Sequence, residues 1–200
     1  MANPNTPRGL VPYRAAAGGP FAGQGNIYFC PASDANNIFV GDPVIVSGLG
    51  DANGLPAVTL ATAGSSNYIT GSMMGIVPAG APILNEIAVT RDLPVYRQAS
   101  VATYILVADD PGQLFWIQED SVGGALAATA VSENANLVAG AGSTNYGTSG
   151  WQLQSSSANT TNTLQLRILR GLQESDNTIG AYFKWLVRIN LHSVSNPTGV

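Results

Sequence analysis

The chain has 200 residues, and only 20 of them carry a formal charge, 8 Lys or Arg and 12 Asp or Glu. Soluble domains average about 25% charged residues, so most of this surface must be neutral, and neutral surface is readily covered by a neighbouring subunit. The net charge of −4 and the pI near 4.7 exclude a general affinity for nucleic acid, because binding phosphates needs many basic side chains. The length predicts one domain, and no apolar run is long enough to span a membrane.

Residues 1–25 are rich in proline and glycine, with Pro4, Pro7, Pro12 and Pro20 spread through the segment. This spacing leaves no room for a helix or a central strand, so we predict an extended N-terminal arm. The arm is either a frayed terminus or a segment that packs on a neighbouring subunit. In the second case its apolar and basic side chains would make the contacts, and these are Arg8, Leu10, Val11, Tyr13, Arg14 and Phe21. No basic stretch followed by an apolar one begins the chain, so we expect no signal peptide.

From residue 26 onward, short β-prone runs alternate with turn residues, and no amphipathic helical repeat competes with them. We expect strands at 26–30, 38–47, 57–61, 68–77, 102–108, 113–118, 151–153, 163–169 and 182–192. The turn at 110–112 (Asp-Pro-Gly) is short enough to predict a hairpin between its flanking runs.

The stretch at about 121–160 is rich in Gly, Ala, Ser, Thr and Asn, which predicts a long irregular excursion with one weak helical turn near 126–131. The expected fold is therefore mainly β. Residues 26–200 form a single β-sandwich or jelly-roll-like domain, and a barrel stays open because it produces the same alternation.

The last quarter of the chain has the clearest pattern. Large apolar residues at every second position of 183–191 predict a strand with one buried face, and 164–168 repeats the pattern. If these two strands pair, four of the eight basic residues gather near one another, and these are Arg167, Arg170, Lys184 and Arg188. They form either a solvated face with local ion pairs to Glu174 or Asp176, or a docking patch for an acidic partner surface.

The residues do not predict catalysis. Cys30 is the single cysteine, so we expect a buried thiol and neither a disulfide nor a cysteine-based zinc site. His192, the single histidine, is expected on the polar face of the last strand, without an evident carboxylate or nucleophile beside it. The carboxylate pairs at 109–110 and 119–120 bracket one strand, about 20 Å apart, which is too far for a glycosidase. Asp110 is expected to accept a backbone N–H in its turn. We therefore expect no enzyme, no metal and no cofactor.

Seven segments, taken in chain order, share features with one family. They are PRGLVP at 7–12, YITG at 68–71, YILVADDP at 104–111, QED at 118–120, LQLRIL at 164–169, DN at 176–177 and KWLVRINLH at 184–192. Together they resemble the head cement, or decoration, proteins, which are small virion proteins of tailed bacteriophages. The resemblance covers nearly the whole chain, and the region 121–160 matches only loosely.

The resemblance implies a β-sandwich or jelly-roll-like body that binds the outside of the capsid as dimers or trimers and has no catalytic residues. The expected partners are the major capsid protein and further copies of this chain, with no direct contact to nucleic acid or membrane. We expect the protein on the outer capsid surface of the virion after synthesis in the host cytoplasm. Removal of residues 1–20 is expected to weaken capsid association and to leave the folded core intact.

A second hypothesis is a virion adhesin that binds host surface glycans through exposed aromatic side chains. The candidates include Trp116, Trp151 and Trp185. Aromatic residues on alternating strands lie more often in the core, so we expect the core for most of them.

Overall fold

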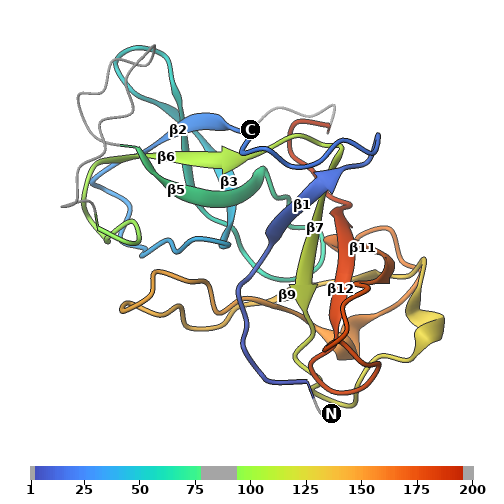
Figure 1. Cartoon of the computed structure of the whole chain (residues 1–200). Coiled ribbons are helices and arrows are strands. Elements are labelled where there is room, and N and C mark those ends of the chain that lie inside the picture. Colours follow the sequence, from blue (N-terminus) through green and yellow to red (C-terminus); the bar gives the residue numbers. More distant parts are fainter. Residues whose placement is uncertain (1–2, 78–93, 196–200) are drawn as a thin grey trace.

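The computed structural model describes residues 3–77 and 94–195. Within these ranges the protein is mainly β, as predicted, and its sheets pack in a sandwich-like arrangement (Figure 1). Five strands close into a barrel in the order β2-β4-β3-β5-β6, and five others form a sheet in the order β1-β7-β12-β11-β8. The sequence pattern is compatible with either a sandwich or a barrel. The structure combines a closed barrel with a separate sheet. No helix in the described residues is long and apolar enough to cross a membrane.

The barrel comes from the first half of the chain. Its strands are β2 (Asn26–Cys30), β3 (Pro43–Gly50), β4 (Pro56–Leu60), β5 (Gly71–Val77) and β6 (Thr103–Ala108). Alternate side chains fill its interior, including Val44, Met73, Ile105 and Val107, each 0% exposed. Cys30 is also fully buried in this cluster, which confirms the prediction of a buried thiol.

The open sheet carries the larger core. Its strands are β1 (Val11–Ala15), β7 (Gln113–Gln118), β8 (Asn134–Ala135), β11 (Leu166–Gly171) and β12 (Lys184–Ile189). β11 and β12 pair antiparallel, which meets the condition on which the gathering of their basic residues depends. Trp185, Val187 and Ile189 of β12 face inward and join Phe115 and Ile117 of β7 in one hydrophobic cluster. One face of this sheet is therefore buried in the hydrophobic core.

The turn at Asp110 exists, but the predicted hairpin is wrong. Gln113 N–H donates to the Asp110 carbonyl at 2.9 Å, and Gly112 N–H donates to Asp110 Oδ1 at 2.7 Å, as expected for a turn. The two flanking strands do not pair, because β2 and β5 already occupy both edges of β6. The turn instead carries the chain out of the barrel and into the sheet, where β7 lies between β1 and β12.

The N-terminal segment is part of the fold of its own chain. β1 is an edge strand beside β7, a position that tolerates Pro12. Before it, Asn3 donates to the carbonyls of Thr178 and Ala181, and Leu10 N–H donates to the Gly41 carbonyl. Removing residues 1–20 would therefore take away an edge strand and buried contacts, so the expectation of an intact core does not hold.

The excursion at 121–160 is irregular, with short elements. Its 3-10 helix η1 (Ala128–Ala130) confirms the predicted helical turn, and a second, η2 (Ser155–Ser157), follows later. β9 (Leu137–Val138) pairs with β10 (Gln152–Leu153), and the chain between them closes a loop.

Candidate docking surface

The strand register places three arginines in one row across the open sheet. Arg167 on β11 lies opposite Arg188 on β12, Arg188 lies opposite Leu114 on β7, and Leu114 lies opposite Arg14 on β1. Residues directly opposite each other in a ladder project from the same face of a sheet. Neighbouring strands are about 5 Å apart, so the row spans the width of four strands.

Further basic residues share this face. Arg170 lies opposite Leu186, and Leu186 lies two positions before Arg188 on the same strand. Lys184 lies two positions before Leu186 and belongs to the same face. The intervening residues of β12, Trp185 and Val187, face the core. The basic residues therefore occupy the outer face of the sheet, and we call Arg14, Arg167, Arg170, Lys184 and Arg188 the basic face.

The basic face differs from the sequence prediction by one residue. The four basic residues of the C-terminal strands do gather there, as expected. Arg14 was assigned to the arm, yet the pairing of β1 with β7 places it in the same row. That pairing joins residues about 100 positions apart, and no local pattern in the sequence indicates it.

Lys184 differs from the four arginines because its charge is balanced locally. Its Nζ lies 2.8 Å from Glu174 Oε2 and 3.9 Å from Asp176 Oδ2, which confirms the predicted ion pairs for this residue. It also lies over the Trp116 ring, 5.6 Å from the centroid. Such exposed pairs contribute about 0–1 kcal/mol each, so Lys184 adds little net charge to the face.

The four arginines have no carboxylate partner within the described residues. Arg167, Arg170 and Arg188 are exposed, and Arg14 is half-buried with a buried Nε that donates to no acceptor in the same part of the chain. The guanidinium is always charged and binds carboxylates through paired N–H donors. The face thus offers four unneutralised cations on a protein of net charge −4.

Negative charge is concentrated on the other half of the molecule. The described part of 26–112, which builds the barrel, contains five acidic residues and one basic residue, Arg97. Arg97 is fully buried. This segregation gives the protein a positive sheet face and a negative barrel, and it favours one orientation on a charged partner.

The predicted arm contacts fall into two groups. Leu10 is 0% exposed and belongs to the main core cluster, so its side chain is not available to a neighbour in this structure. Phe21 is half-buried and packs against the same cluster. Arg8 and Tyr13 are exposed, Tyr13 by 42%, and Val11 is half-buried opposite Trp116.

The carboxylates that the sequence singled out have structural partners. Glu119 is 0% exposed and accepts from Trp185 Nε1 at 3.0 Å and from Leu126 N–H, and burial raises its pKa. Asp109 accepts from Asn26 Nδ2 and Tyr28 Oη. These contacts tie strands and loops together, and they leave neither carboxylate in a cleft with the other.

His192 does not lie on a polar strand face, because β12 ends at Ile189 and the imidazole is only 3% exposed. Burial lowers its pKa, against the opposing effect of nearby Asp109 and Asp110. No group of three or more His, Cys, Asp or Glu in 3–77 and 94–195 is arranged to hold a metal ion.

The sequence did not predict the burial of two charged residues, Arg97 and Asp42. Arg97 is fully buried and donates to the carbonyls of Pro31, Asp34 and Asn36, with Asp34 Oδ2 at 3.8 Å. Asp42 is 2% exposed and accepts from Phe39 N–H at 2.8 Å. Both residues fix the conformation of loops beside the barrel. This role depends on tertiary contacts, so no local sequence pattern indicates it.

The arrangement can bind an acidic surface, because the unpaired charged groups of this face are cations spread over a sheet. Comparisons of the chain with protein-family models, with curated proteins and with solved structures found no match.

Proposed function

We propose that this protein is a structural virion protein of a tailed phage that binds the outside of the assembled head and stabilises contacts between major capsid subunits. The proposal rests on the family resemblance of its segments and on the basic face. It acts as a dimer or trimer, without catalysis and without a cofactor.

The observation that carries the proposal is a set of four arginines that have no carboxylate partner among the described residues, Arg14, Arg167, Arg170 and Arg188. An isolated protein gains nothing from placing Arg167 opposite Arg188, since like charges directly opposite each other repel. An acidic partner surface would turn this repulsion into attraction. The low charge of the remaining surface limits the desolvation cost of docking beside it.

Stabilisation of a shell follows from mass action. A protein that binds the expanded shell and not its precursor or its fragments lowers the free energy of the expanded state. Each contact can be weak, because many copies act on one shell and their contributions add.

The test is co-sedimentation of the purified protein with expanded capsids that lack it, followed by heating of decorated and bare shells. We expect saturable binding at a fixed ratio and a higher rupture temperature for the decorated shells. Arg167→Glu/Arg188→Glu should abolish binding. Arg8→Glu tests the arm separately, because Arg8 is exposed and lies outside the basic face, and Asn53→Glu in an exposed turn of the barrel is the control. Binding that survives the double reversal would contradict docking through this face.

The adhesin hypothesis retains one supporting observation. Tyr146, in the loop between β9 and β10, is 82% exposed and could stack on a sugar ring. The tryptophans offer less, since Trp151 and Trp185 are 3% and 1% exposed and Trp116 lies beneath Lys184. This function would be favoured if the purified protein did not bind capsids, bound a host glycan, and lost glycan binding in the Tyr146→Ala variant.

A further inference from the structure

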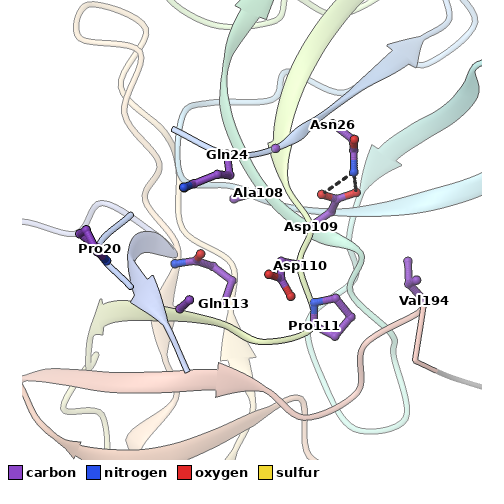
Figure 2. Close-up of a pocket in the computed structure, with 11 residues that line it drawn as sticks. Pro20, Gln24, Asn26, Ala108, Asp109, Asp110, Pro111, Gln113 and Val194 are labelled. Atoms are coloured by element: carbon purple, nitrogen blue, oxygen red, sulfur yellow. Dashed lines mark hydrogen bonds between the residues drawn. The ribbon is translucent and has the colours of Figure 1, made fainter. Parts of the chain in front are cut away.

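A cavity of about 510 Å³, lined by both polar and apolar residues, lies where the barrel meets the open sheet. Its walls come from the end of β6, the turn that follows it, the start of β2 and the facing ends of β1 and β7. The polar side chains that line it are Gln24, Asn26, Asp109, Asp110 and Gln113 (Figure 2). None of the basic-face residues lines it, although Ala15 and Gln113 of the lining adjoin Arg14 and Leu114 in the β1–β7 pair.

Two carboxylates give the cavity its charge, and one of them has spare acceptor capacity. Asp109 is engaged, since both its oxygens accept from Asn26 Nδ2 and its Oδ2 also accepts from Tyr28 Oη at 2.7 Å. Asp110 is exposed and uses only Oδ1, which accepts from Gly112 N–H. Its Oδ2 accepts no hydrogen bond from the described residues.

Gln113 supplies a second free acceptor, and its orientation is determined by its donors. The side chain is only 6% exposed, and Nε2 donates to the carbonyls of Arg14 at 3.2 Å and Leu114 at 2.8 Å. Because the nitrogen must face these two carbonyls, the amide cannot be flipped. Its Oε1 accepts from no group in the part of the chain that the structure describes, and the residue lines the cavity. Figure 2 shows Gln113 and Asp110 among the lining residues, both below Gln24 in the view.

The lining contains no Lys, Arg or His. A cavity that offers a carboxylate and a nearly buried amide oxygen, with no cation of its own, favours a ligand that carries positive charge and several N–H donors. The guanidinium is the side chain that meets both needs, because its planar fork can donate to two acceptors at once and it is less strongly hydrated than an ammonium.

We propose that this cavity receives an arginine side chain of a neighbouring protein subunit. It would add a second contact, opposite in sign to the basic face, and would fix the orientation of the protein on its partner. The Asp110 carboxylate supplies the charge, and Gln113 Oε1 supplies the second acceptor.

The experiment is a titration of the ¹⁵N-labelled full chain with N-acetyl-argininamide, followed by amide chemical shifts. N-acetyl-citrullinamide is the matched neutral probe, since it has nearly the same shape without the charge. We expect saturable shifts at Gln24, Asn26 and Gln113 with the arginine compound, with a Kd on the order of millimolar for so small a ligand, and at least a tenfold weaker response to citrulline.

Asp110→Asn tests the assigned role, because asparagine keeps the oxygen that accepts from Gly112 N–H and loses only the charge. This variant should bind the arginine probe at least tenfold more weakly while its other amide shifts stay unchanged. Asp51→Asn, a turn carboxylate outside the cavity, should bind like the unaltered chain. Equal responses to the two probes, unaltered binding by Asp110→Asn, or no saturable shift at the cavity would each overturn the proposal. None of these outcomes bears on shell binding through the basic face, which is measured separately.

Discussion

Arg167 and Arg188 face each other across β11 and β12, with no carboxylate from the described residues beside either. Directly opposed like charges destabilise a sheet pair by a few tenths of a kcal/mol to about 1 kcal/mol. The isolated protein therefore carries repulsion at the centre of its basic face. Residues retained at such a cost in stability often serve binding.

The first prediction concerns this repulsion. Arg188→Gln should leave the free energy of unfolding unchanged or raise it by up to about 1 kcal/mol, because it removes one of two opposed charges. Arg167→Gln should have the same effect. The double variant should gain less unfolding free energy than the two single variants added together, since either change already relieves the repulsion. Urea denaturation of the four proteins measures the coupling. A loss above about 1 kcal/mol in Arg188→Gln would show that this side chain stabilises the fold, as in the alternative of a solvated face with local ion pairs.

The second prediction separates the two roles of the N-terminal segment. Leu10→Ala should lower the free energy of unfolding by about 2–5 kcal/mol, because it opens a cavity in the main core. Tyr13→Ala, at a position 42% exposed, should cost less than about 1 kcal/mol. Shell binding by Tyr13→Ala then tests the arm as a contact without disturbing the fold. A small effect of Leu10→Ala on unfolding would mean that this segment detaches readily from the core.

The sequence allowed the strands to be predicted better than their pairing. Alternation in β12 and β11 reflects burial of one face, so it indicates both strands, whereas their pairing was only a condition that the structure meets. The Asp110 turn was also predicted, yet its strands pair elsewhere, because pairing depends on which edges the barrel already fills. Arg14 joined the basic face through a contact with β7 that local patterns cannot reveal. The buried Arg97 depends likewise on carbonyls more than 60 residues away in the chain.

The third prediction concerns Arg97. Its guanidinium joins three carbonyls of the 31–36 loop, and a lysine can neither reach them in the same geometry nor offer as many donors. Arg97→Lys should therefore lower the free energy of unfolding by more than about 2 kcal/mol, since buried acceptors lose their partners. It should also speed amide exchange in the 34–38 segment, where Ile38 pairs with Arg97. Arg8→Lys, an exposed arginine outside this cluster, is the control and should change unfolding by less than about 0.5 kcal/mol.

The last prediction concerns pH. Burial raises the pKa of Asp42 to about 6, against hydrogen bonds from Ser149 and Phe39 that lower it. In the unfolded chain the pKa returns to about 3.9. The folded state therefore binds the proton more tightly, so this group's contribution to stability is full below about pH 4 and is lost as the pH rises to about 6.

Asp42→Asn removes that dependence. The difference in unfolding free energy between Asp42→Asn and the unaltered chain should shift in favour of the variant by roughly 2 kcal/mol between pH 4 and pH 7. His192 acts in the opposite direction. Its pKa is lowered by burial, so its contribution is present above its ordinary pKa of about 6.5 and is lost on acidification. Because His192 and Glu119 are present in both proteins, their contributions cancel in this difference, and urea denaturation of the two proteins at each pH isolates Asp42. A difference between the two proteins that stays constant from pH 4 to 7 would mean that Asp42 titrates normally in the folded state.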